Sequence, residues 1–133
     1  MHYKKIKSYE DACADQGKDP EALPDYSKCG LTPGEQKFNL AAFKLSRILA
    51  SVNKDEKGNA WKPTNRDSRY FPWVWWNDQK DPRSGSRLSL YDVTYDRSDP
   101  YVASRLTCRD RQRALYVFEQ FITLFEDLMI FEE

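Results

Sequence analysis

The most constraining feature of this chain is the aromatic run at residues 70–76, which holds three of its four tryptophans. Aromatic side chains bury large areas, so such a run lies either in a core or on a contact surface. Aromatic residues favour β-strands, in which successive side chains point to opposite faces. Trp73 and Trp75 would then share one face of the strand, and Tyr70 and Trp76 the other. Both faces of the predicted strand are therefore apolar.

Two interpretations of these faces are open. In the first, one face packs on helices and the other is covered by the polar linker at residues 53–69, which carries Trp61. In the second, one face stays exposed and contacts a partner protein or stacked bases. The first interpretation is favoured, because a domain of this size needs its aromatic residues for its core.

Length and charge restrict the class of protein. The chain has 133 residues, and we expect a single domain over residues 1–133. Its 21 basic and 21 acidic residues cancel, so no overall field attracts it to nucleic acid or to an anionic membrane. Aromatic residues make up 14% of the chain, which argues against intrinsic disorder.

Two helices in the first half have clear start signals. Ser8 is a suitable N-cap for a short helix at residues 9–16. Thr32 and Glu35 have the spacing of a capping box, which predicts the start of a long helix at residues 33–52. The apolar residues of this long helix recur at helical spacing: Phe38, Ala41, Ala42, Leu45, Ile48, Leu49 and Val52.

A second apolar series at helical spacing predicts another long helix at residues 111–129. Its members are Ala114, Leu115, Phe118, Phe121, Ile122, Phe125, Leu128 and Met129. Asp110 and Thr107 are both suitable N-caps for this helix. We favour Asp110, because that choice leaves residues 106–108 free to complete a strand.

Three segments have the pattern of antiparallel strands: residues 70–76, 88–95 and 102–109. Pro72 lacks a backbone N–H group, which indicates an edge or an early position in the first strand. The alternation of the second strand slips by one residue between Leu90 and Tyr91, and a β-bulge there would restore it. The predicted fold is α+β: a three-stranded antiparallel meander packed against two long helices, with a short N-terminal helix.

Chemistry-bearing motifs are scarce. The cysteines are few and widely separated, at Cys13, Cys29 and Cys108, and His2 is the only histidine. A structural zinc site needs about four such ligands, so we expect no metal. The five glycines stand singly, so no phosphate-binding loop and no cofactor are expected. Asp92 and Asp96 lie on one face of a strand, but nothing marks them as an acid–base pair, and we expect no enzyme activity.

The location of the protein follows from two segments. The first residues lead into acidic residues and not into an apolar stretch, so no signal peptide is expected. The most apolar segment is interrupted by Glu119, Glu126 and Asp127, so no membrane span is expected either. Unpaired cysteines also suit a reducing compartment. These features together predict a cytoplasmic protein.

Several segments, spread over most of the chain, stand in a recognisable order. They are Ile6-Lys7-Ser8-Tyr9-Glu10-Asp11-Ala12-Cys13, Asp19-Pro20 and Leu23-Pro24, Tyr70-Phe71-Pro72-Trp73, and Ser104-Arg105-Leu106-Thr107-Cys108 with Arg111, Ala114, Tyr116, Gln120 and Phe121. In this order the chain resembles small proteins of unknown function from phages and prophages of gut Bacteroidetes, including crAss-like relatives. It differs in a longer polar linker and in Arg113, where an apolar residue is usual. The resemblance implies a phage-encoded protein in the cytoplasm of an infected bacterium, and brings no activity or site residues with it.

We therefore expect a non-enzymatic binding protein that interferes with a host system or assists phage replication through protein contacts. Its predicted partner-binding residues are Trp73, Trp75, Trp76, Tyr70, Arg69 and Arg87. Association of copies of this chain through the aromatic edge strand is another open arrangement.

The alternative function is single-stranded nucleic-acid binding, in which bases stack on the aromatic residues beside flanking arginines. These arginines are Arg66, Arg69, Arg83 and Arg87, with Arg105, Arg109, Arg111 and Arg113 clustered before the last helix. Aspartates are interleaved with them, which suits surface ion pairs at least as well as phosphate binding.

Overall fold

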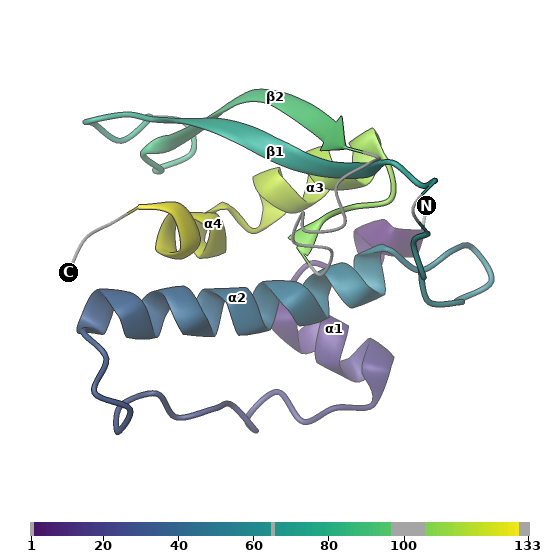
Figure 1. Ribbon diagram of the computed structural model, residues 1–133, viewed down its shortest axis with the longest axis horizontal. Helices are drawn as coiled ribbons and strands as arrows, with labels where there is room; N and C mark the ends of the chain where they lie inside the picture. The colour runs from purple at the N-terminus through teal and green to yellow at the C-terminus, as the bar shows by residue number, and fades with distance from the viewer. Residues whose placement is uncertain (1, 65, 97–105, 131–133) are drawn as a thin grey trace.

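The protein is a layered α+β structure in a computed structural model that describes residues 2–64, 66–96 and 106–130. Its elements in chain order are η1 (His2–Lys5), α1 (Tyr9–Gln16), α2 (Pro33–Val52), β1 (Arg69–Trp76), β2 (Leu88–Asp96), α3 (Arg111–Gln120) and α4 (Ile122–Met129). The hairpin of β1 and β2 forms the outer layer, α3 and α4 lie beneath it, α2 follows, and α1 packs on α2 (Figure 1).

The predicted start signals of α1, α2 and α3 are confirmed. The Ser8 side chain accepts a hydrogen bond from a backbone N–H of the first turn of α1. At α2, the Thr32 hydroxyl accepts from the Glu35 N–H (3.1 Å) and the Glu35 carboxylate accepts from the Thr32 N–H (2.9 Å), which completes the capping box. The Asp110 carboxylate caps α3 by accepting from the backbone N–H of Arg113 (2.8 Å).

The prediction of a second long helix at residues 111–129 is wrong, because Phe121 divides it into α3 and α4. The backbone of Phe121 (φ −118°, ψ 33°) lies outside the helical region, while its side chain is buried. The two short helices pack differently: α3 contacts both strands as well as α2, whereas α4 packs mainly on α2. The break thus lies at a buried residue, between a half that also contacts the hairpin and a half that packs mainly on α2.

The described sheet has two strands, and the predicted three-stranded meander is not observed. Residues 97–105, which include part of the predicted third strand, lie outside the described residues. Of the rest, Cys108 forms a single isolated bridge with Tyr70, in which each N–H donates to the other carbonyl oxygen. The next hydrogen-bonded pair of such a ladder would join Leu106 to Pro72, and Pro72 has no N–H to donate. The ladder therefore cannot continue regularly along β1.

The core lies between the inner face of the hairpin and the helices. Its buried members include Leu45, Ile48, Leu49 and Val52 of α2, Leu88 and Val93 of β2, Val117 and Phe118 of α3, and Phe125 of α4. On the other side of α2, the α1 segment contributes Ile6, Tyr9, Ala12 and Cys13, as their spacing places them on one side of the short helix. Helix α2 is thus covered on two sides.

A buried cation, Arg113, joins three parts of the fold. Its Nε donates to the Val52 carbonyl oxygen (2.7 Å) and its Nη2 to that of Lys54 (3.2 Å), at the end of α2. Its Nη1 binds the Asp110 carboxylate, and its guanidinium carbon lies 4.6 Å from the centre of the Tyr3 ring. Arg113 thus supplies donors to carbonyl groups that the end of a helix leaves without partners.

Asn53 makes a second set of contacts at the same helix end. Its side-chain Nδ2 donates to the Thr107 carbonyl oxygen (2.8 Å), and its Oδ1 accepts from the Arg109 N–H (3.0 Å). The Arg109 guanidinium in turn donates to the Asn53 carbonyl oxygen (2.9 Å). These bonds fix the segment that leads into α3 against the end of α2.

Replacing Arg113 tests the importance of this junction. We expect Arg113→Met to lower the free energy of unfolding by about 3 kcal/mol, because it removes the donors to two carbonyl groups and the ion pair with the Asp110 carboxylate. The matched control is Arg66→Met, since Arg66 is exposed and should change that free energy by about 0.5 kcal/mol or less. Urea unfolding followed by circular dichroism measures both values. Equal effects of the two variants would show that the junction does not stabilise the fold.

Candidate functional site

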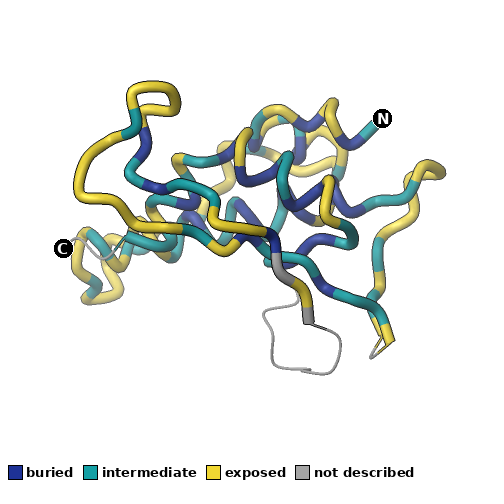
Figure 2. The backbone as a smooth tube through the Cα atoms, turned by 90° about the horizontal axis from the view of Figure 1, so that it is seen from above, coloured by how far each residue is buried: buried dark blue, intermediate teal, exposed yellow. Residues whose placement is uncertain are grey.

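The outer face of the hairpin carries the aromatic residues that the helices do not cover. Opposite residues of β1 and β2 pair as Pro72 with Val93, Trp73 with Asp92, Val74 with Leu90 and Trp75 with Ser89. Pro72 and Val93 are buried toward the helices, so alternation places Trp73 and Trp75 on the opposite side. Figure 2 looks down on this side and shows the exposed connection between the strands.

The predicted β-bulge brings a third ring to this face. The register shifts between Trp73 and Val74, so Tyr91 is an extra residue between the partners Leu90 and Asp92. The Tyr91 ring centre lies 5.2 Å from the ring centre of Trp73 and 5.2 Å from that of Trp75, at interplanar angles of 73° and 90°. We call Trp73, Tyr91 and Trp75 the aromatic face.

The aromatic face is exposed to solvent, and contacts between its rings hold them in place. The exposed fractions of Trp73, Trp75 and Tyr91 are 59%, 58% and 56%. Edge-to-face contacts of this kind stabilise a pair of rings and restrict their rotation. Within the described residues, the two indole N–H groups and the Tyr91 hydroxyl have no hydrogen-bond partner, so they remain available to a ligand.

The charges beside the aromatic face are already paired. The Asp92 carboxylate accepts from the Val93 N–H (2.8 Å) and binds the Arg111 guanidinium (3.1 Å). The backbone N–H of Val93 and the Arg111 cation lower the pKa of Asp92. Arg111 also donates to the Val93 carbonyl oxygen (3.3 Å). This ion pair lies at the border of the face next to Trp73.

The structure separates the other predicted partner-binding residues from this face. Trp76 is exposed at the end of β1, where the guanidinium carbon of Arg87 lies 5.5 Å from its ring centre. Tyr70 is half-buried, and its ring centre lies 5.5 Å from that of Tyr95. Arg69 is buried and donates to a nearby backbone carbonyl. Of the predicted residues, only Trp73 and Trp75 belong to the aromatic face.

Tyr91 was missing from the predicted site, although the sequence contained its signal. The slip in alternation after Leu90 predicted a bulge, and a bulge redirects the side chain of the extra residue. The slip after Leu90 therefore also indicates that Tyr91 changes face.

The arginines near the last helix serve the fold. Arg109 and Arg113 bind backbone carbonyl groups at the end of α2, and Arg111 is paired with Asp92. Arg105 lies outside the described residues. The predicted groove of arginines beside stacked aromatic rings is therefore not formed by the described members of this cluster.

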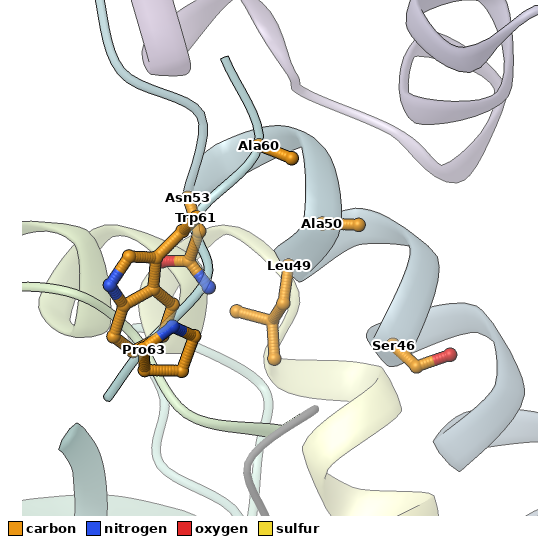
Figure 3. A pocket seen from close by; sticks show the side chains of 7 residues that line it. All are labelled: Ser46, Leu49, Ala50, Asn53, Ala60, Trp61 and Pro63. Carbon is orange, nitrogen blue, oxygen red and sulfur yellow. The ribbon is translucent and has the colours of Figure 1, made fainter. Parts of the chain in front are cut away.

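Trp61 lines a hollow elsewhere on the molecule. This hollow, of about 290 Å³, lies between the C-terminal half of α2 and residues 60–63, with Trp61 and Pro63 on one wall and Leu49 and Ser46 on the helix (Figure 3). The linker at Trp61 thus packs beside α2. The interpretation in which it covers the second face of β1 is wrong for the aromatic face, whose rings stay more than half exposed.

The described residues provide little for covalent chemistry. Cys13 and Cys108 are buried, and Cys29 is exposed. Burial, together with the negative charge of Asp110, raises the pKa of the Cys108 thiol to about 12. In the described ranges, no three His, Cys, Asp or Glu side chains gather as metal ligands. The side chain of Asp96, the predicted neighbour of Asp92, is not described.

Comparisons of the chain with protein-family models, with curated proteins and with solved structures find no match. The resemblance to phage proteins therefore stays a prediction from the residues. Among the helices of the described residues, none has both the length and the apolar character that crossing a membrane requires.

The exposure of the aromatic face predicts how its residues affect stability. We expect Trp75→Ala to lower the free energy of unfolding by at most about 1.5 kcal/mol, the value of its edge-to-face contact. Leu88→Ala, in the core of the same hairpin, should lower it by about 2 to 5 kcal/mol. Urea unfolding measures both. A loss for Trp75→Ala as large as that for Leu88→Ala would show that the ring belongs to the core.

The burial of the cysteines predicts their reactivity. In the folded protein, iodoacetamide should alkylate the exposed Cys29 and leave Cys13 and Cys108 unmodified, because both of these side chains are buried and the reagent cannot reach them. Burial also raises the pKa of the Cys108 thiol, which disfavours its reactive thiolate. In denaturant all three should react, and mass spectrometry of peptides counts the labels. Rapid native labelling of Cys108 would contradict its position in the core.

Proposed function

We propose that this protein is a non-enzymatic binding protein that recognises another protein through its aromatic face. The observation that carries the proposal is the exposure of Trp73, Tyr91 and Trp75 on the outer side of a hairpin whose inner side is covered by helices. A monomer rarely exposes adjoining large apolar side chains without using them.

The physical properties of the face suit protein recognition. Tryptophan and tyrosine are enriched among the residues that contribute most to binding free energy. The rings of the aromatic face hold one another through contacts at 5.2 Å, so little side-chain entropy is lost when a partner packs on them. The neutral pairing of Asp92 with Arg111 at the border resembles the polar rim of an interface.

Single-stranded nucleic acid is the second candidate, because bases stack on exposed tryptophan rings. Binding of this kind also needs cations that neutralise phosphates. Arg111, the arginine beside Trp73, is already bound to a carboxylate, and Arg109 and Arg113 are bound at the end of α2. A protein partner is therefore the better proposal.

The biological setting of this proposal comes from the resemblance stated above. We propose a phage-encoded protein that acts in the cytoplasm of the host bacterium, either on a host system or in phage replication. A second copy of the chain is another candidate partner, because apolar sheet surfaces favour association.

A pull-down with matched variants tests the proposal. The bait proteins are the wild type, the double variant Trp73→Ala/Trp75→Ala and the control Phe38→Ala, which removes an exposed aromatic ring from α2. Circular dichroism first checks that each variant folds. We expect one protein to be retained by the wild type and by Phe38→Ala and lost from the double variant, and to bind again as a purified component.

The outcomes separate the candidate functions. Recovery of the same proteins by all three baits would contradict a role for the aromatic face. Recovery of nucleic acid that the double variant loses, and that falls steeply as salt rises, would favour the second candidate. Sedimentation of the wild type alone detects self-association.

A further inference from the structure

We propose that the segment recognised by the aromatic face is proline-rich and binds as a polyproline II helix. This inference rests on the proposed function and specifies the chemistry of the partner. Polyproline II segments are recognised elsewhere by grooves lined with aromatic side chains, and they bind in a conformation that is already formed in solution.

Hydrogen-bonding polarity is the first reason for this choice. The free polar groups of the aromatic face are the indole N–H groups of Trp73 and Trp75 and the hydroxyl group of Tyr91. An indole N–H group can only donate. A polyproline II segment has no internal hydrogen bonds, and its proline residues offer carbonyl acceptors without N–H donors. The partial positive charges of the indole N–H groups thus match the partial negative charges of the carbonyl oxygens in such a segment.

The border of the face extends this donor character. The Arg111 side chain is about half exposed (52%), and its Nη1 contacts Asp92 and the Val93 carbonyl oxygen. A guanidinium group has five N–H donors, so Arg111 keeps donors for a further carbonyl group. Asp92, which pairs with Trp73 across the strands, binds the Val93 N–H and Arg111 through one carboxylate oxygen, Oδ1.

The hydrogen-bonding groups of the aromatic face also disfavour other ligands that stack on aromatic rings. A sugar presents hydroxyl groups that need acceptors as well as donors, whereas the indole N–H groups of Trp73 and Trp75 can only donate. A nucleic acid strand needs several free cations along its phosphates. A proline-rich segment needs neither, and its apolar rings can pack on the faces of Trp73 and Trp75.

Preorganisation is the second reason. The Tyr91 ring is in edge-to-face contact with both indoles, at interplanar angles of 73° and 90°, and these contacts restrict the rotation of the three rings. A polyproline II ligand is equally stiff. Binding between two preformed surfaces loses little conformational entropy, which lets a short segment bind specifically.

Calorimetric titration with a synthetic decaproline peptide tests the inference, with a ten-residue glycine–serine peptide as the control ligand. We expect decaproline to bind the wild-type protein and the control peptide not to bind. Trp73→Ala and Trp75→Ala should each weaken binding by about tenfold or more, because each removes a packing surface. Phe38→Ala, on α2, should leave the dissociation constant within about twofold of the wild type.

A conservative variant isolates the hydrogen bond from the packing. Trp73→Phe keeps an aromatic ring but removes the indole N–H, and we expect it to weaken decaproline binding by about threefold to tenfold. An unchanged dissociation constant for Trp73→Phe would overturn the role of the donor. Equal binding of decaproline by the wild type and the double variant Trp73→Ala/Trp75→Ala would overturn the site.

The results also separate this inference from the proposed function. No binding of decaproline at about 1 mM peptide overturns the proline-rich ligand. If the pull-down still finds a protein that depends on Trp73 and Trp75, the proposed function stands with a different ligand chemistry. If the pull-down also shows no dependence on the aromatic face, both proposals fail.

Discussion

The guanidinium group of Arg113 is the interaction on which the rest of the structure depends. A cation in the interior is tolerated only when its donors are satisfied, and Arg113 satisfies them at the end of α2, at the Asp110 carboxylate and over the Tyr3 ring. It therefore joins α2, the start of α3 and the N-terminal segment at one point. An apolar residue at this position would leave carbonyl groups at the end of α2 without donors.

The hairpin depends on this helical base, and that dependence explains why one of its faces is free. Two strands alone are marginally stable in water, so β1 and β2 need the helices beneath them. Leu88 and Val93 provide that contact from the inner side. Because the inner side attaches the hairpin to the helices, the aromatic rings of the outer side are not needed for this attachment. The cost of exposing them supports a binding role.

Local signals allowed much of the fold to be predicted. The N-caps Ser8, Thr32 and Asp110 and the bulge beside Tyr91 act through neighbouring residues, and each is found as expected. The candidate site could be predicted in part, because alternation alone places Trp73 and Trp75 on one face of a strand. Arg69 was assigned to the same site by proximity in sequence, although burial and hydrogen bonding direct it elsewhere.

The sequence by itself determined the α+β class, the helix starts and the concentration of aromatic residues in one strand, because capping and periodicity depend on residues close in the chain. Only the tertiary structure decided three other features. The helix after Asp110 breaks at Phe121, where a half that contacts the strands and α2 gives way to a half that packs mainly on α2. Cys108 makes one bridge with β1, since Pro72 cannot extend the ladder. The aromatic face is exposed, since the Trp61 segment packs beside α2. Each feature depends on contacts between segments that are far apart in the chain, and the periodicity of apolar residues does not predict those contacts.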